Sequence, residues 1–207
     1  MDTKVCGFAV FDPSLPVDTP NREDLAGASP RGVVIWLTGL SGAGKTTLAE
    51  ALAANLRRLG RFSVVLDGDR MRARLSRDLG FSEADRFENV RRIAEVAALV
   101  AEADGIAIVA AISPLAAMRD AARALVGERF REVYVSTSLA VCEARDPKGL
   151  YARARRGELP GFTGVAAPYE PPVAAELVID TAGCERDACV DALLWFTLDA
   201  SAAVRRG

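Results

Sequence analysis

Residues 33–47 read VVIWLTGLSGAGKTT, and this stretch carries the strongest signal for the class of fold. Its first six residues form a continuous apolar run rich in β-branched side chains, which predicts a strand covered on both faces, as in a parallel sheet. Residues 39–46 fit the pattern G-x-x-x-x-G-K-[ST]. Glycines let successive backbone N–H groups point inward at an anion, and a following helix adds its free N–H groups and its dipole. The stretch therefore predicts a strand, a phosphate-binding turn and a helix in succession.

The turn predicts a nucleoside triphosphate site. We expect the Lys45 ammonium to reach the β- and γ-phosphates and the Thr46 hydroxyl to hold magnesium. The chain has only three lysines among its 26 basic residues, so Lys45 indicates a position where a compact ammonium is favoured over a guanidinium. The alternative is a chance match in a glycine-rich turn, which the flanking strand and helix disfavour. The residues expected to contact the nucleotide are Gly39, Leu40, Ser41, Gly42, Ala43, Gly44, Lys45, Thr46 and Thr47.

Strand and helix patterns alternate along the rest of the chain. Apolar runs predict further strands at 63–66, 106–112, 133–135 and 177–179. Helical patterns cover roughly 45–59, 82–103, 115–126, 139–144, 148–156 and 185–204. Five strands that alternate with helices predict a three-layer α/β fold of the P-loop NTPase class, with a five-stranded parallel sheet flanked by helices. Residues 1–30, rich in Pro, Asp and Ser, predict an irregular N-terminal arm, so that the domain spans 31–207.

Composition excludes several classes of protein. A net charge of −2, from 26 basic and 28 acidic residues, gives no reason to expect nucleic-acid binding. The absence of histidine excludes Ser-His-Asp and Cys-His catalysis and any His-ligated metal. The four cysteines form no C-x-x-C pair, which indicates reduced thiols in a cytosol. No signal peptide is apparent, and residues 106–112 are too few to cross a bilayer, so we predict a cytoplasmic protein without a membrane partner.

Two carboxylates directly follow the second predicted strand, in the run Asp67-Gly68-Asp69. Ligands of open α/β sheets bind beyond the carboxyl ends of the strands, so both acids are expected to face the γ-phosphate. One could orient magnesium through water, and the other could accept the proton of an attacking hydroxyl. The alternative is a structural role for Asp69 as the N-cap of the helical stretch that follows.

From this run onward the sequence resembles the adenosine 5′-phosphosulfate (APS) kinase family. The resemblance is carried by LDGDRMRARLSRDLGFSEADRFENVRR at 66–92, AISP at 111–114, VCEARDPKGLYARARRGELPGFTG at 141–164 and PYEPP at 168–172. It covers about residues 31–182 and implies a P-loop kinase with a mobile basic lid at about 145–170. The implied reaction transfers the γ-phosphoryl of ATP to the 3′-hydroxyl of APS, giving PAPS and ADP in sulfate assimilation. The resemblance also implies Mg²⁺, a homodimer and an association with ATP sulfurylase.

The resemblance assigns the ligands of the acidic substrate. Asp69 is expected near the 3′-hydroxyl and magnesium, with Asp67 in support. Arg72, Arg86 and Asn89 match positions that hold the sulfate-phosphate end of APS, and guanidinium groups suit such oxygens because they bind them in a bidentate manner. The alternative for this stretch is a solvated helix face, which we expect for Arg70, Arg74 and Arg91.

Aromatic and lid residues complete the implied site. Phe81 and Phe162 match the two aromatics that sandwich the APS adenine, although core packing is the default role of a phenylalanine. Lys148 matches the lysine of the family's RDPKGLY motif and is expected to contact substrate. Ile112 and Ser113 are expected at the acceptor, and Ser113 matches the family's phosphoserine position. Direct in-line transfer needs no covalent step, so we expect a hydroxyl that contacts substrate.

The sequence departs from the family after Ser113-Pro114, where a Tyr and a basic residue are usual and Leu115 and Ala116 stand here. These positions are expected to border the substrate pocket. Two alternatives therefore stay open: a kinase of the same fold for another small hydroxyl substrate, and a non-catalytic nucleotide-binding module that regulates a partner. The complete set of Lys45, Asp67 and Asp69 argues against the second.

Overall fold

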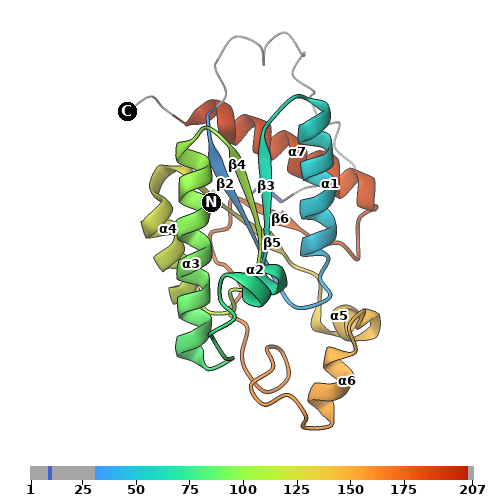
Figure 1. Cartoon of the computed structure of the whole chain (residues 1–207). Coiled ribbons are helices and arrows are strands. Elements are labelled where there is room, and N and C mark those ends of the chain that lie inside the picture. Colours follow the sequence, from blue (N-terminus) through green and yellow to red (C-terminus); the bar gives the residue numbers. More distant parts are fainter. Residues whose placement is uncertain (1–8, 11–30, 205–207) are drawn as a thin grey trace, which may run out of the picture.

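The computed structural model describes residues 9–10 and 31–204, which form a parallel sheet between two layers of helices (Figure 1). Six strands lie in the order β1-β6-β5-β2-β4-β3. The strands are β1 Ala9–Val10, β2 Val33–Thr38, β3 Ser63–Asp67, β4 Ile106–Ala110, β5 Phe130–Val135 and β6 Leu177–Ile179. The helices are α1 Lys45–Arg58, α2 Gly68–Arg74, α3 Glu83–Glu102, α4 Ala116–Val126, the short 3-10 helix η1 Gly127–Arg129, α5 Leu139–Arg145, α6 Leu150–Arg155 and α7 Arg186–Ala203.

Strand β2 lies at the centre and is buried along its whole length. Ile35 packs into the core shared with α1 and α7, whereas Trp36 packs into the core shared with α3 and α4. Two buried faces require apolar residues at every position, which is why the run VVIWLT lacks polar alternation. The predicted three-layer fold and its five parallel strands are confirmed.

The structure differs from the predictions at four strands. β3 ends at Asp67, one residue beyond the predicted end. β4 ends at Ala110 rather than 112, and Ser113 in the loop that follows has a φ of 38°. β5 begins at Phe130, three residues before the predicted start. Ala9 and Val10, in the arm predicted to be irregular, form a sixth strand that pairs with Leu177 and Val178 of β6. A sheet edge presents unpaired N–H and C=O groups, so an adjacent segment is stabilised by pairing with it.

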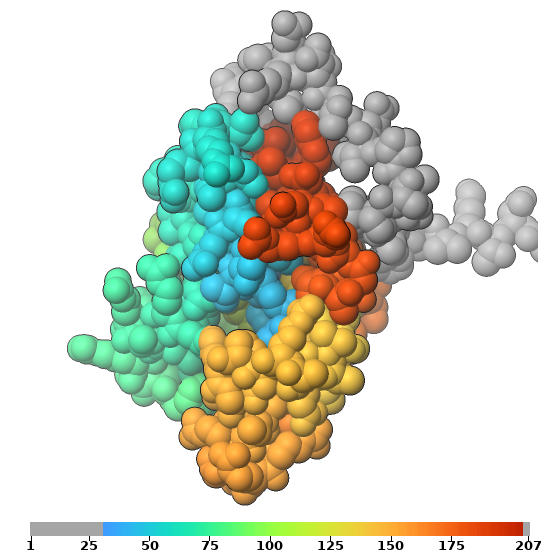
Figure 2. Space-filling view, turned by 90° about the vertical axis from the view of Figure 1, so that its right-hand side faces the viewer, coloured from blue at the N-terminus to red at the C-terminus, as the bar shows by residue number. Residues whose placement is uncertain are grey.

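The carboxyl ends of the strands all meet at one edge of the sheet, where α2, α5 and α6 gather (Figure 1). We call residues 145–170 the lid segment. Figure 2 shows this segment, in yellow to orange, as a lobe beneath α1. None of the helices within residues 31–204 is both long and apolar enough to cross a membrane. Free thiols are present at Cys142, Cys184 and Cys189.

Candidate active site

The phosphate-binding turn, residues 39–46, links β2 to α1 and depends on its glycines. Gly39, Gly42 and Gly44 have φ values of 148°, 77° and 101°. A Cβ on Gly39 would lie 2.5 Å from the carbonyl oxygen of Val135, and one on Gly42 would lie 2.9 Å from that of Cys142. Both the dihedral angles and the lack of space therefore exclude other residues. The predicted turn between strand and helix is confirmed, and we call it the P-loop.

The Lys45 side chain folds back onto the P-loop and binds its backbone carbonyl groups. Its buried ammonium donates to the carbonyl oxygens of Gly39 at 2.9 Å and Leu40 at 2.7 Å. Burial lowers the pKa of Lys45 to about 8, although Cys142 and Asp69 act in the opposite direction. Because the pKa of Lys45 is lowered to about 8, an anion that enters the P-loop would raise this pKa and stabilise the protonated ammonium.

Thr46 and Asp67 bring the P-loop and β3 together. The Thr46 hydroxyl donates to Asp67 Oδ2 at 2.7 Å. The other oxygen of Asp67 accepts the backbone N–H groups of Asp69 and Arg70, both at 3.1 Å, and so caps α2. The N-cap of this helix is therefore Asp67, and the structural alternative considered for Asp69 is wrong: Asp69 lies one residue inside the helix, because β3 continues to Asp67.

Asp69 instead faces the lid segment, where its Oδ2 accepts a hydrogen bond from the Lys148 ammonium. Both side chains are more than half exposed, at 72% and 55%. The contact with Asp69 raises the pKa of Lys148. α2 and the α5–α6 turn thus meet at the mouth of the site through one ion pair.

One cleft of about 810 Å³ joins these groups. It runs from the P-loop past α2 to α3 and the lid segment, at the edge of the sheet where ligands of open α/β folds bind. Of the predicted site residues, it is lined by Ser41, Gly42, Gly44, Lys45, Thr46, Thr47, Asp67, Asp69, Arg72, Phe81, Arg86, Asn89, Ile112, Ser113, Lys148 and Phe162. Gly39, Leu40 and Ala43 belong to the P-loop but do not line the cleft. The same cleft also contains Arg70, for which a solvated helix face was predicted.

Arg86 and Asn89 lie one turn apart on α3 and face this cleft. Arg86 donates to the carbonyl oxygens of Phe81 at 2.9 Å and Gly161 at 2.7 Å, and to the Thr163 hydroxyl at 2.8 Å. Asn89 is 5% exposed, and its Oδ1 has no hydrogen-bond partner among the described residues. A buried amide oxygen without a partner is costly, so it marks a position where a ligand donor would be stabilising.

The two predicted aromatic residues both line the cleft and come from different segments of the chain. Phe81 precedes α3 and is 70% exposed, with the Arg72 guanidinium 4.6 Å from its ring centre. Phe162 belongs to the lid segment and packs edge-on against Tyr151 at 5.1 Å. Exposure of a large aromatic in a cleft argues against a core role for Phe81. Phe162 combines partial core packing with a position in the cleft.

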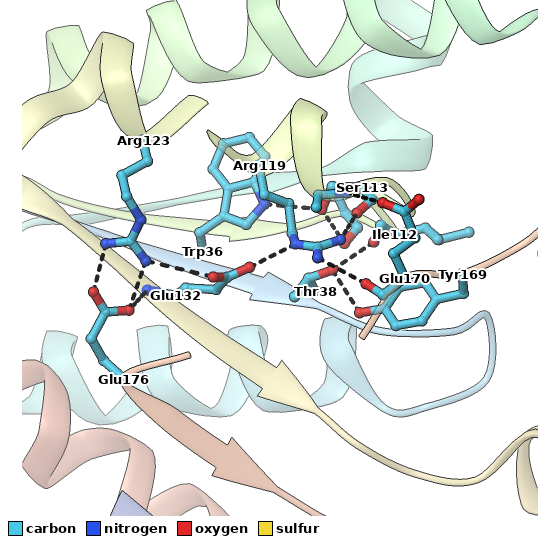
Figure 3. A network of polar contacts seen from close by, with 12 residues as sticks. Trp36, Thr38, Ile112, Ser113, Arg119, Arg123, Glu132, Tyr169, Glu170 and Glu176 are labelled. Carbon is cyan, nitrogen blue, oxygen red and sulfur yellow. Dashed lines mark hydrogen bonds and ion pairs between the residues drawn. The ribbon is translucent and has the colours of Figure 1, made fainter. Parts of the chain in front are cut away.

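Ser113 is 3% exposed, and its hydroxyl accepts a hydrogen bond from Trp36 Nε1 at 3.0 Å (Figure 3). The same hydroxyl donates to the Ala111 carbonyl at 3.4 Å. Within residues 31–204 no carboxylate or amine is hydrogen-bonded to this oxygen, so no general base stands beside it. The carbonyl of Ile112 accepts from the Thr38 hydroxyl at 2.7 Å. The neighbouring Leu115 packs against the α3 and α4 core, and neither it nor Ala116 lines the cleft.

The predicted basic surface of the lid segment is largely neutralised. Arg155 pairs with Glu143, and both Arg153 and Arg156 pair with Glu158. Their guanidinium groups are thus held by acids on either side of the arginine run, and only Arg145 and Lys148 of this run line the cleft. Arg145 was not predicted as a site residue, although it stands in the motif ARDPKG. It donates to the hydroxyl and carbonyl of Thr181 beside the P-loop.

A P-loop between a parallel strand and a helix, with two carboxylates at the next strand and a lid segment across the cleft, defines the class of P-loop kinases. Comparison with known proteins identifies the family within this class. The sequence model of the family described as Adenylylsulphate kinase matches residues 31–180. The chain belongs to this family and is an ATP-dependent phosphotransferase with an alcohol acceptor.

Relatives and solved structures agree with this assignment. The chain is 55% identical over 175 residues to the adenylyl-sulfate kinase of Shewanella amazonensis, covering 84% of this chain and 88% of the relative. It is 53% identical over 164 residues to that of Bacillus velezensis, covering 79% and 83%. The APS kinase of Mycobacterium tuberculosis, solved in complex with AMPPNP and APS, matches with a TM-score of 0.76 and 43% identity over 83% of this chain and 98% of that chain.

Proposed function

We propose that the chain transfers the γ-phosphoryl of ATP to the 3′-hydroxyl of APS, giving PAPS and ADP in sulfate assimilation. The observation that carries the proposal is that one cleft is lined by P-loop residues, by two loop aromatics and by Asn89, whose buried Oδ1 has no hydrogen-bond partner within residues 31–204. A phosphate site and a site for a base with an anionic end thus share one cavity. Relatives named adenylyl-sulfate kinase at 50–55% identity support the same substrate pair.

On the donor side, P-loop N–H groups and Lys45 bind the ATP phosphates. The oxygens of Thr46 and Asp67, at 2.7 Å, are hard ligands of the kind that Mg²⁺ prefers. Thr46 and Asp69, the predicted magnesium ligands, would therefore hold Mg²⁺ with the support of Asp67, whose Oδ2 accepts from the Thr46 hydroxyl. Bound Mg²⁺ would supply charge neutralisation between the β- and γ-phosphates.

On the acceptor side, Phe81 and Phe162 stack on the APS adenine, and Arg72, Arg86 and Asn89 bind its sulfate-phosphate end. Arg86 uses three of its five N–H donors on Phe81, Gly161 and Thr163, which leaves two for substrate oxygens. The same contacts tie α3 to the lid segment, so that the guanidinium is fixed in orientation before substrate arrives. Ser113 and Ile112 form the wall beside the acceptor.

At the point of transfer, Asp69 accepts the proton of the 3′-hydroxyl as that oxygen attacks the γ-phosphorus, while the bond from the γ-phosphorus to the β–γ bridging oxygen breaks and ADP leaves. Lys148, paired with Asp69, brings positive charge to the place where phosphoryl charge develops. The lid segment excludes water that would otherwise hydrolyse ATP. Every step uses groups that line one cleft, and none needs a phosphorylated Ser113.

ADP formation by the purified chain with MgATP, with and without APS, tests the proposal, and the product is identified as PAPS by chromatography and mass spectrometry. We expect ADP formation to depend on APS. ADP formation that does not depend on APS but is stimulated by another hydroxyl compound would establish a kinase of the same fold for another small hydroxyl substrate. Nucleotide binding without turnover on any acceptor would establish the regulatory module. Leu115 and Ala116 no longer favour the other kinase, because neither lines the cleft.

The proposal includes a homodimer, an association with ATP sulfurylase and a cytoplasmic location. Sedimentation velocity across a range of concentrations tests the dimer. Co-sedimentation with purified ATP sulfurylase tests the association, with an unrelated enzyme of similar size as the control. The dimer and the association rest on the family alone, whereas the cytoplasmic location rests on the four cysteines, which form no C-x-x-C pair.

A further inference from the structure

Arg119 lies in α4, outside the residues assigned to the substrates, and it is 3% exposed. Its guanidinium contacts three different residues (Figure 3). It donates to the carbonyl oxygens of Ser113 and Glu170, each at 2.8 Å, and its Nε lies 2.8 Å from Glu132 Oε1. One buried side chain therefore contacts the loop after β4, the end of the lid segment and strand β5.

Packing alone does not account for an arginine at this position. Burying an ion pair costs several kcal/mol in desolvation, and well-packed apolar side chains of similar volume are often as stable or more stable. The negative charge of Glu132 explains why a cationic side chain stands at position 119. An ion pair with Glu132 alone, however, would need only one donor group. The two backbone carbonyls need the planar, multidirectional guanidinium, because an ammonium cannot reach both while it pairs with Glu132.

The first carbonyl belongs to a strained residue of the cleft wall. Ser113 has a φ of 38°, a left-handed value that costs a residue other than glycine of the order of 1–3 kcal/mol and persists only where the surroundings impose it. Arg119 holds its carbonyl, and Trp36 holds its hydroxyl. Ala111 to Pro114 line the cleft on the acceptor side. Arg119 thus helps to set the backbone shape of that wall.

The second carbonyl belongs to the segment that leads out of the lid. The Glu170 N–H donates to Pro114 O at 2.8 Å, and its carboxylate accepts from the Ala116 N–H at 2.6 Å. The adjacent Tyr169 hydroxyl is 2.9 Å from the Thr38 hydroxyl. Glu170 is therefore joined directly to Pro114 of the loop that carries Ser113 and to Ala116 at the start of α4, and through Arg119 to Ser113 itself. The acceptor wall and the end of the lid segment therefore form one hydrogen-bonded unit.

We propose that Arg119 is a positioning residue for phosphoryl transfer, because it locks the Ser113 loop and the Glu170 end of the lid segment into the arrangement that receives the acceptor. The proposal rests on the proposed APS kinase activity. Arg119 touches no substrate; it acts through the backbone of Ser113 and Glu170. Its loss should weaken the acceptor site and leave the P-loop unaffected.

The test uses three variants of the full chain. Arg119→Lys keeps the charge but not the three-way contact. The double variant Arg119→Met with Glu132→Leu removes both buried charges together, so that no unpaired charge threatens folding. Arg123→Gln is the matched control, since Arg123 lies one turn further along α4 and pairs with Glu176 and Glu132 without contacting Ser113 or Glu170.

We expect the KM for APS to rise about tenfold or more in the first two variants, as for the loss of charge-assisted hydrogen bonds, with the KM for ATP within about twofold of wild type. We expect amide hydrogen exchange at Ala116 and Glu170 to quicken about tenfold in the same variants. Arg123→Gln should change neither readout. A folded double variant with unchanged exchange, or with equal rises in both KM values, would overturn the proposal.

Hydrogen exchange also separates this proposal from the proposed function. If the wild-type chain forms no ADP in response to APS, the proposed function fails, and exchange at Ala116 and Glu170 alone decides whether Arg119 joins the two segments. If APS is turned over, both readouts must change for the proposal to hold.

Discussion

Thr46 and Asp67 stand 21 positions apart in the chain, and the threonine hydroxyl donates to Oδ2 of the carboxylate at 2.7 Å. The other Asp67 oxygen caps α2, which carries Asp69. One carboxylate therefore ties the nucleotide loop, the end of β3 and the helix of the proposed base into a single unit. Displacing any of the three should disturb the other two.

Removal of the Thr46 hydroxyl should weaken Mg²⁺ binding. We expect Thr46→Val to raise the Mg²⁺ concentration for half-maximal activity by at least about tenfold, because even indirect contacts to a metal contribute that much to affinity. Mg²⁺ titration of APS-dependent ADP formation measures the effect. Thr46→Ser keeps the hydroxyl and is the control. A Thr46→Val enzyme with the wild-type Mg²⁺ requirement would remove Thr46 from the metal site.

Neutralising Asp69 should stop transfer without preventing nucleotide binding. We expect Asp69→Asn to lower kcat by about a hundredfold or more, as for loss of a general base, while the Kd for an ATP analogue changes little. Steady-state assays of ADP formation give kcat, and isothermal titration calorimetry gives the Kd for the ATP analogue. Asp78→Asn, which removes an exposed carboxylate paired with Arg92, is the control. Turnover close to wild type in Asp69→Asn would exclude Asp69 as the base.

Truncation of the two aromatics should affect APS and ATP differently. Stacking of a base on an aromatic ring contributes about 1–3 kcal/mol, so we expect Phe81→Ala and Phe162→Ala to raise the KM for APS between about fivefold and a hundredfold, with little change for ATP. Phe81→Ala should leave the melting temperature unchanged, because the side chain is 70% exposed.

Phe162→Ala should also lower the melting temperature, because it removes the edge contact with Tyr151, worth about 0.5–1.5 kcal/mol. Thermal unfolding of both variants measures this difference. Equal losses for APS and ATP would instead indicate that the two phenylalanines serve packing.

Replacing Arg86 by lysine should reduce APS affinity although the charge is kept. The guanidinium donates to Phe81, Gly161 and Thr163 together, and an ammonium cannot reproduce that fork. We expect the KM for APS to rise about tenfold in Arg86→Lys. Arg91→Lys, on the outer face of the same helix, should stay within about twofold. Equal effects of the two substitutions would contradict the role of Arg86.

The pH dependence of ATP binding should report Lys45. Burial places its pKa at about 8, so in the free enzyme the ammonium loses its proton as the pH rises through 8. ATP phosphates favour the protonated form, so we expect ATP affinity to fall above pH 8 and binding there to take up a large fraction of one proton. Calorimetry at pH 8.5 in buffers of different ionisation enthalpy measures that uptake. Zero uptake, or the same uptake in Lys45→Met, would exclude Lys45 as the source.

Much of the fold and of the site could be predicted because the signals are local. An apolar run with no polar alternation reports two buried faces, and the spacing of glycines before Lys45 reports a backbone that only glycine can adopt. Most residues that line the cleft outside the P-loop could be predicted because the run from Asp67 to Asn89 and the lid motifs resemble those of the family. Each of these signals is contained in a few consecutive residues.

The class of fold, the P-loop and the residue types that meet in the cleft follow from the amino-acid sequence alone. Which partner each side chain takes depends on the folded structure. Asp67 rather than Asp69 meets Thr46 and caps α2, and Glu143 and Glu158 pair with the arginines of the lid segment. Arg119 contacts both Ser113 and Glu170, and Glu170 lies 51 positions beyond Arg119 in the chain. The reason is physical: backbone patterns follow from local sterics, whereas ion pairs and hydrogen bonds depend on the distances that folding creates between remote segments.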